Sequence, residues 1–223
     1  DMSKVENMAI VWGGEVRMAN LCVCACSAIN GVSALHTDIL KSDVFHNAYR
    51  MFPQKFQNVT NGVDHRRWLS EVNPQLDALI RETCGGDKYL LQPSALSGLE
   101  KYAGDKAVLD RLAKIKKENK ERFAAWAKRE SGITLNTSAM FDVQVKRLHE
   151  YKRQLLNVLH IIYLWQRLHE DPHFDMTPRT YLFGAKAAPS YTMAKEIIHL
   201  INSLSHTINN DPVCKDKLQV FFL

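Results

Sequence analysis

The densest group of chemically useful side chains in the sequence lies in the segment 146–153. Its basic members are Lys146, Arg147, His149, Lys152 and Arg153. They surround the predicted start of a helix, with Lys152 expected in its opening turn. A helix N-terminus already carries about half a positive charge, so cations are unfavourably placed there. The placement makes physical sense if a multiply charged anion binds among them, held by the helix dipole, free amide groups and side chains. The alternative is a set of solvated surface cations, partly offset by Glu150.

The elements around this segment alternate between strand and helix. Alternating apolar residues predict a strand at 141–145, and further strands are predicted at 180–183 and 218–223. Helical spacing of apolar residues predicts a helix before and after the middle strand. The apolar positions of the first helix are Leu148, Tyr151, Leu155, Leu159, Ile162 and Trp165. This order indicates a Rossmann-like parallel β-α-β-α-β unit in an α/β protein, with right-handed crossovers. Ligands bind beyond the carboxyl ends of such strands, where Lys146 and Arg147 fall.

The loop after the middle strand, residues 184–189, is not a dinucleotide-binding fingerprint. It contains one glycine followed by small residues, and the second and third glycines of that motif are missing. A single glycine here is typical of a tight strand-to-helix turn. A nicotinamide cofactor is therefore not expected.

The sequence before these elements is predicted to be mainly helical. An apolar helical pattern runs from 17 to 41, and proline and asparagine–glycine turn signals break the periodicity between 52 and 68. Asp64 is the predicted N-cap of the helix that follows the break. We therefore assign residues 1–62 to the end of an N-terminal domain and residues 63–223 to the first part of a second, Rossmann-like domain.

Composition and charge exclude several classes of protein. Hydrophobic residues make up 46% and charged residues 24% of the 223 residues, which excludes wholesale disorder. The net charge is +5, and the basic stretch 111–129 mixes both signs at helical spacing. That spacing predicts a solvated helix face and no nucleic-acid partner. No apolar run reaches about 18 residues, and no cationic segment leads into an apolar one at the start, so neither a membrane span nor a signal peptide is predicted.

The cysteines do not form a metal site by their spacing. Three of the five, Cys22, Cys24 and Cys26, alternate with apolar or small residues, and no histidine or acidic residue falls at ligand spacing. Cys84 and Cys214 stand alone. We expect all of them to be small buried apolar residues in a reducing, cytoplasmic environment, with no bound metal.

Several longer segments resemble signature blocks of one enzyme family, the α-glucan phosphorylases, which act on glycogen, starch and maltodextrin. The longest segment is 141–154, with the sequence FDVQVKRLHEYKRQ. The others are 30–32 (NGV), 55–62 (KFQNVTNG), 66–68 (RRW), 186–189 (KAAP) and 209–212 (NNDP). They occur in the family's order, and the resemblance covers essentially the whole chain. The bacterial members are the closest in appearance.

The resemblance implies a fold and a reaction. The family has a two-domain glycosyltransferase fold of the GT-B type, with pyridoxal 5'-phosphate in the cleft between the domains. It cleaves the ends of α-1,4-glucan chains with inorganic phosphate and releases glucose 1-phosphate with retention of configuration. The phosphate of the cofactor exchanges a proton with the substrate phosphate. Full-length members are commonly homodimers.

The resemblance also implies which residues handle the phosphates. Lys146 and Lys152 would neutralise the cofactor phosphate and the adjoining substrate phosphate. Arg147 would clamp the substrate phosphate, for which a planar guanidinium is well suited. Trp68 would pack near the cofactor, and His149 lies in the same turn as the three cations. Two polyanions in contact need a dense cationic cage of this kind.

Other residues are implied to contact the sugar or to line the mouth of the site. Asn61 and Tyr151 would hydrogen-bond the glucosyl unit at O6 and O2. Tyr191 matches an aromatic residue at the active-site mouth, where some members bind purine-like inhibitors. Ser27 stands where many members carry a histidine that contacts the sugar, and it offers a hydroxyl in place of that ring.

The family's cofactor-attachment lysine lies in a motif that this sequence does not contain. Together with the position of the last predicted strand, this predicts that the chain is an internal fragment with an incomplete GT-B fold, inactive by itself. Two alternatives are a catalytically inactive fragment that binds glucan or phosphate, and an unrelated anion-binding Rossmann enzyme.

Overall fold

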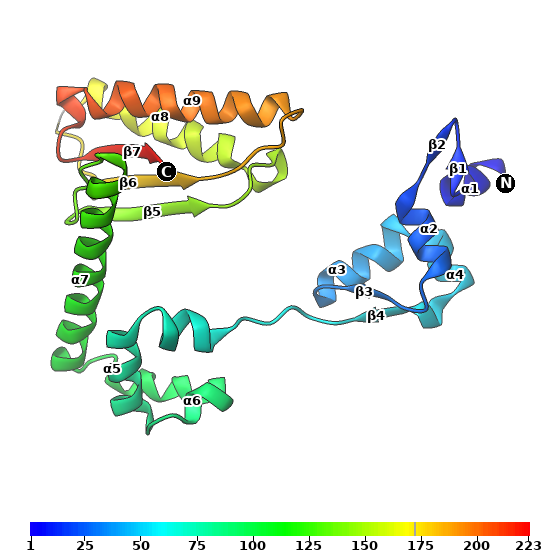
Figure 1. The fold of residues 1–223 in the computed structure, drawn as a ribbon, viewed down its shortest axis with the longest axis horizontal. Coiled ribbons are helices and arrows are strands. Elements are labelled where there is room, and N and C mark those ends of the chain that lie inside the picture. Colours follow the sequence, from blue (N-terminus) through cyan, green and yellow to red (C-terminus); the bar gives the residue numbers. More distant parts are fainter. Residues whose placement is uncertain (172) are drawn as a thin grey trace. The chain divides into compact units, whose positions relative to one another are not determined.

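The computed structural model describes residues 1–171 and 173–223, which form two compact units, residues 1–73 and 74–223 (Figure 1). Each unit has its own apolar core. Within the described residues, no helix combines the length and the apolar character needed to cross a membrane.

The first unit is built from short elements. In chain order they are α1 (Met2–Met8), β1 (Val11–Trp12), β2 (Glu15–Val16), α2 (Met18–Ala25), β3 (Ile29–Gly31), α3 (Ala34–Ile39), a π-helical turn (Leu40–Val44), α4 (His46–Met51), a 3-10 turn (Pro53–Lys55), β4 (Phe56–Asn58) and a second π-helical turn (Arg66–Glu71). The strands β1 and β2 form an antiparallel hairpin, and β3 pairs with β4 in parallel. The core consists of Val23, Ala48 and Phe56 with their partly buried apolar neighbours.

The prediction of one helical stretch from 17 to 41 is wrong, because the strand β3 interrupts it. Gly31, the last residue of β3, lies so close to α3 that an added Cβ would be 2.1 Å from Thr37 Oγ1 and 2.6 Å from the Thr37 main chain. Ser33 then caps α3 by accepting a hydrogen bond from the His36 amide (3.1 Å). A close backbone contact and a capping residue therefore separate two helices that the apolar pattern joined.

A lysine side chain fixes the end of α2. The Lys55 ammonium group donates to the carbonyl oxygens of Val23 (3.2 Å) and Cys24 (2.9 Å), which are free acceptors in the last turn of the helix. The same group lies 5.1 Å from the ring centre of Phe52. The 3-10 turn before β4 is thereby tied to α2.

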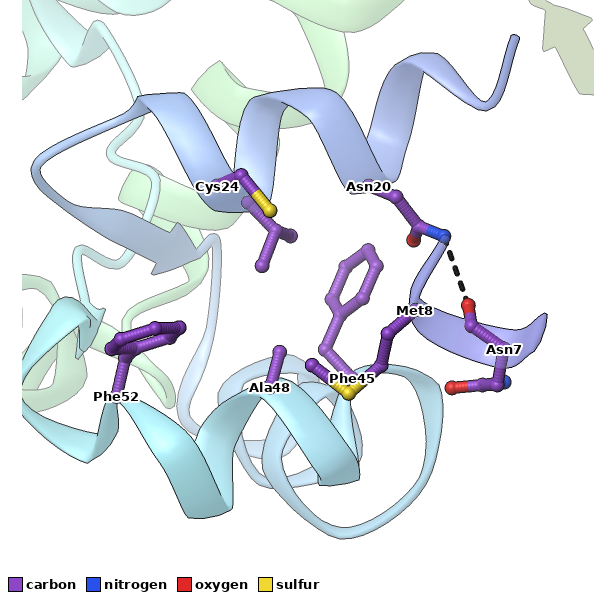
Figure 2. A pocket seen from close by; sticks show the side chains of 8 residues that line it. Asn7, Met8, Asn20, Cys24, Phe45, Ala48 and Phe52 are labelled. Atoms are coloured by element: carbon purple, nitrogen blue, oxygen red, sulfur yellow. Dashed lines mark hydrogen bonds between the residues drawn. The ribbon is translucent and has the colours of Figure 1, made fainter. Parts of the chain in front are cut away.

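A small, mainly apolar pocket lies between α1, α2 and α4 (Figure 2). Phe45 and Met8 face it from one side and Cys24 from the other, and Asn20 closes one end by donating to the Asn7 carbonyl (2.9 Å). Its volume is about 20 Å³, which is enough for one water molecule. The pocket is therefore a packing gap, too small for a substrate or cofactor.

The prediction that all the cysteines are buried is wrong for three of them. Cys22, Cys24 and Cys26 are exposed, whereas Cys84 is partly buried and Cys214 is buried. The reason is that α2, a helix of 8 residues, buries only Val23 among its own residues. Burial raises the pKa of the Cys214 thiol to about 12, so this cysteine behaves as the sequence predicts.

The second unit begins with helices and ends with a parallel sheet. The helical part comprises α5 (Pro74–Cys84), α6 (Lys88–Leu91), a 3-10 helix (Pro93–Tyr102) and α7 (Lys106–Ser131). Asp105 caps α7 by accepting from the Ala107 and Val108 amides, and Gly132 ends it with a φ of 71°. The outer face of α7 carries ion pairs between residues four apart, at 3.8 and 3.9 Å, as expected for the solvated face predicted over 111–129.

The sheet confirms the predicted β-α-β-α-β order. The strands β5 (Met140–Val145), β6 (Arg179–Gly184) and β7 (Leu218–Phe222) are all parallel, in the spatial order β5-β6-β7. The helices α8 (Gln154–Glu170) and α9 (Thr192–Asn209) lie together on one face of this sheet (Figure 1). Tyr181 and Phe183 of β6 are buried against these helices, whereas Leu182 packs toward α7 on the other face.

The apolar face that the sequence predicts for α8 is buried only in part: Leu148 is in the core and Ile162 and Trp165 pack against it. The buried residues of this helix are Gln154, Val158, Ile161, Leu164 and Leu168. Leu159, from the predicted face, is 53% exposed, and Tyr151 before the helix is 75% exposed. The helix carries apolar residues on more than one face, so periodicity alone could not select the face that meets the sheet.

Asp211 ties the end of α9 to α8. Its Oδ2 accepts from the Trp165 indole (2.7 Å) and lies 2.6 Å from His169 Nε2, while its Oδ1 accepts from the Val213 amide (2.9 Å). The bond from Trp165, followed by those from His169 and Val213, holds the pKa of Asp211 below its ordinary value of 3.8. The carboxylate form is therefore the form that stabilises the fold.

Replacing Asp211 by asparagine is expected to lower the free energy of unfolding by about 1–2 kcal/mol at neutral pH, the size of a hydrogen bond to a charged group. Because the pKa is lowered in the folded chain, this stabilisation is present above the ordinary value near 3.8 and is lost as the pH falls through the folded pKa. Urea unfolding at about pH 7 and about pH 3 tests this, and the difference from wild type should shrink at the lower pH. Asp110→Asn, at an exposed position of α7, is the matched control. An equal difference at both pH values would contradict the assignment.

Candidate functional site

The main chain of the segment 146–153 begins at the carboxyl end of β5 and continues the pairing of the sheet beyond the strands. The Lys146 amide donates to the Gly184 carbonyl (3.0 Å), and the Leu148 amide donates to the Lys186 carbonyl (3.1 Å). The Leu148 side chain is 1% exposed and anchors the segment in the core under α8 and α9. The segment is thus pinned to the loop after β6, at the edge of the sheet where ligands bind in this class of fold.

The helix after the segment starts later than predicted. Residues Glu150–Lys152 form a 3-10 turn, Arg153 takes a left-handed conformation (φ 61°, ψ 33°), and α8 begins at Gln154. Lys152 therefore lies before the helix, and the prediction that it occupies the opening turn is wrong. A non-glycine residue in the left-handed region costs about 1 kcal/mol or more and is typical of functional sites.

An open hollow lies beside β5 and the start of α8. Its lining consists of Gln144, Lys146, Tyr151, Lys152, Arg153, Leu156, Asn157 and His160. The structure thus places Lys146 and Lys152 in the lining of the same hollow. Arg147 is exposed and is not among the residues that line this hollow.

The cations of the segment lack acidic partners. In the part of the chain that the structure describes, Lys146, Arg147, Lys152 and Arg153 make no ion pair with a carboxylate. The nearest acidic residue in sequence, Glu150, is engaged by the Tyr191 hydroxyl, which donates to its carboxylate (2.7 Å). Glu150 therefore forms no ion pair with these cations in the described part of the chain, and its carboxylate is bound to Tyr191 instead. A group of unpaired cations at one edge suits a multiply charged anion.

The aromatic side chains gather next to the cations. The His149 ring lies 5.7 Å from the Tyr151 ring and 5.8 Å from the Tyr191 ring. The Tyr191 hydroxyl also accepts a hydrogen bond from the Glu150 amide (3.2 Å). Its bond to the Glu150 carboxylate raises the pKa of Tyr191 above the ordinary value, so the phenol is held in its neutral form.

Three side-chain amides support the main chain of the segment 146–153, and none of them was predicted from the sequence. Gln144 donates to the Lys152 carbonyl (3.2 Å) and accepts from Asn157 (2.9 Å). Gln154 donates to the Arg147 carbonyl (3.3 Å). The available signals were weak: a polar residue inside an apolar strand, and two amide side chains three residues apart on one helix.

The remaining predicted site residues belong to the first unit. Asn61 is exposed, and its amide donates to the Val32 carbonyl (3.0 Å). Trp68 is 60% exposed on the second π-helical turn. Asp64 accepts from the Arg67 amide (3.2 Å), which agrees with its predicted capping role.

The chemistry of this donor set fits a phosphate group. Ammonium and guanidinium groups without carboxylate partners supply charge, and the turn that carries them ends at Arg153 in a left-handed conformation. Among the described residues, no group of three histidine, cysteine or acidic side chains could hold a metal ion. The arrangement can bind a multiply charged anion and stabilise negative charge that develops on it.

Comparisons with known proteins all point to one family. A family model described as carbohydrate phosphorylase matches residues 1–223. The chain is 47% identical over 223 residues to the glycogen phosphorylase of Bacillus subtilis, covering 100% of this chain and 28% of that protein. It is 45% identical over 226 residues to the muscle form from Oryctolagus cuniculus and 46% identical over 226 residues to the liver form from Homo sapiens, covering 100% of this chain and 27% of each relative. The chain thus spans little more than a quarter of the length of these relatives.

Proposed function

The chain belongs to the carbohydrate phosphorylase family, and we propose that it is a segment of a glycogen phosphorylase. The reaction is the phosphorolysis of α-1,4-glucan ends by inorganic phosphate to give glucose 1-phosphate with retention. Support comes from the match of the family model to the whole chain and from identities of 45–47% to the bacterial and rabbit muscle glycogen phosphorylases. The proposal includes a full-length homodimer in the cytoplasm.

The proposed architecture is a GT-B fold in which the parallel sheet β5-β6-β7 is part of the second domain. We propose that residues 1–62 end the first domain and that residues 63–223 begin the second. The parallel strands and the placement of the basic segment at their carboxyl ends are consistent with this architecture. The mixed α/β character of the chain agrees with the family's fold class.

The single observation that carries the proposed chemistry is the set of unpaired cations at the end of β5. Lys146 and Lys152 line one hollow and are proposed to hold the phosphate of pyridoxal 5'-phosphate, with Trp68 packing near the cofactor. When bound, that phosphate supplies the proton donor and acceptor for the substrate phosphate. Arg147 is proposed to clamp the substrate phosphate, because its planar guanidinium can form two parallel bonds to it.

The side chains near the cations are proposed to orient the sugar. Tyr151 would bond the glucosyl O2 and Asn61 the glucosyl O6. His149, whose ring lies close to the rings of Tyr151 and Tyr191, is the remaining candidate catalytic residue. Negative charge on the phosphates faces positive charge that develops on the sugar, so no carboxylate pair of the kind used by retaining glycosidases is required.

The proposal is tested with the full-length protein loaded with pyridoxal 5'-phosphate. Incubation with glycogen and inorganic phosphate should release glucose 1-phosphate, and omission of either phosphate or cofactor should abolish the release. A loaded protein that releases no glucose 1-phosphate would contradict the assignment. For the isolated 223 residues, which lack the family's cofactor-attachment motif, we propose phosphate binding without turnover.

A further inference from the structure

Gln154, the first residue of α8, is a buried polar side chain directly under the segment 146–153. It is 2% exposed, and its Nε2 donates to the Arg147 carbonyl (3.3 Å). Its Oε1 is also buried and has no hydrogen-bond partner among the described residues. Among the described residues, the hydrogen bond to the Arg147 carbonyl is therefore the one polar interaction of this side chain.

The burial of this amide is not explained by the stability of the helix. A buried acceptor without a donor destabilises a fold, and an apolar side chain of similar shape avoids that penalty. Methionine has nearly the shape of glutamine and a good helix propensity. What glutamine supplies and methionine cannot is the N–H bond to the Arg147 carbonyl.

Extending the proposed function, we propose that Gln154 is the positioning residue for Arg147. The main chain on either side of Arg147 is held by the amides of Lys146 and Leu148, which donate to Gly184 at the end of β6 and to Lys186 in the loop after it. Gln154 supplies the third attachment, at the Arg147 carbonyl itself. The guanidinium then projects from a fixed main chain, and less conformational freedom is lost when it binds phosphate.

The Lys152 carbonyl has an equivalent attachment. Gln144 donates to it (3.2 Å), and Asn157 fixes the other end of the Gln144 amide (2.9 Å). Two carbonyl oxygens of the segment, at Arg147 and Lys152, thus accept hydrogen bonds from side-chain amides of the neighbouring strand and helix. Because the same kind of bond occurs twice in one segment, a positioning role explains it better than an incidental contact does.

The test uses the 223-residue chain, inorganic phosphate as the probe, and Gln154→Met. Phosphate is titrated into the labelled chain while the amide resonances of Lys146 and Arg147 are followed by NMR, and Tm is measured in parallel. The dissociation constant for phosphate is expected to rise about threefold to tenfold, the effect of one lost hydrogen bond. The Tm should stay unchanged or rise, because the unpartnered buried oxygen is removed.

Gln219→Met is the matched control. Gln219 lies at the opposite end of the sheet, where its Oε1 accepts from the Asn136 amide (2.9 Å) and the Thr180 hydroxyl (3.1 Å). This variant should lower Tm and leave phosphate affinity unchanged. If Gln154→Met behaves like Gln219→Met, the residue is merely structural and the inference is overturned.

A second measurement tests whether Gln154 acts through Arg147. In an Arg147→Met background, Gln154→Met should change the phosphate affinity no further, whereas independent effects would multiply. If Gln154→Met does not fold, Gln154→Glu is compared in both backgrounds, and a larger effect with Arg147 present is expected. Equal effects in both backgrounds would overturn the inference and leave the proposed function standing. Absence of phosphate binding by the wild-type chain would contradict the proposed phosphate site itself.

Discussion

Arg147→Ala in the full-length, cofactor-loaded protein is expected to lower the phosphate-dependent release of glucose 1-phosphate by about 10²–10³-fold, the usual effect of removing one preorganised donor from a site of developing charge. The side chain is exposed and has no carboxylate partner in the described part of the chain. Its removal should therefore leave Tm within about 1 °C of wild type, since surface substitutions seldom change stability. Initial rates at several phosphate concentrations measure the effect.

Two further variants separate charge from geometry. Arg147→Lys keeps the charge and loses the planar fork, so we expect an intermediate loss. Arg122→Ala removes an exposed arginine of α7 whose guanidinium donates to Asn119 in the same helix, and it should leave the rate unchanged. An Arg147→Ala protein with the wild-type rate would remove the proposed phosphate clamp from the mechanism.

Gly31→Ala is expected to destabilise the first unit by about 3 kcal/mol, the upper range for overpacking. The added methyl would overlap Thr37 Oγ1 at 2.1 Å and the Thr37 main chain at 2.6 Å. Main-chain atoms of a capped helix cannot move aside as the end of a flexible side chain can. The parallel pair β3–β4, which joins Gly31 to Asn58, should separate first.

Thermal unfolding and limited proteolysis measure this effect, and new cleavage sites should fall within residues 1–73. Gly62→Ala is the control in the same unit, because a Cβ at that position meets nothing within 4 Å. Equal stability of the Gly31→Ala and Gly62→Ala chains would show that α3 can shift to admit a methyl group.

The sheet of the second unit was predictable from the sequence because its elements are long and regular. Each of its strands alternates or is continuously apolar, and the helices between them carry many apolar residues. The buried face of α8 was only partly predictable, since the exposed Leu155 and Leu159, four residues apart, fit a helical pattern as well as the buried Val158 and Ile161, three residues apart. In the first unit, β3 has 3 residues, which is too short for any periodic signal.

The charged residues of the candidate site were predictable from the sequence, but the residues that hold their main chain were not. Lys146, Arg147 and Lys152 could be found because cations at a strand end are conspicuous in a sequence. The side-chain amides of Gln144 and Gln154 donate to main-chain carbonyl groups. Every residue has such a group, so the sequence does not indicate which ones are bonded. The left-handed conformation of Arg153 could not be predicted either, because the left-handed region of backbone angles normally favours glycine.

The hydrogen bonds that extend the sheet beyond β5 and β6 have a consequence for motion. Because Lys146 is bonded to Gly184 and Leu148 to Lys186, the segment 146–153 and the loop after β6 cannot fluctuate independently. Tyr191 adds a third link through Glu150. The two loops should therefore open and close as one body, with slow amide exchange in both. A ligand that rigidifies one loop will then be felt in the other.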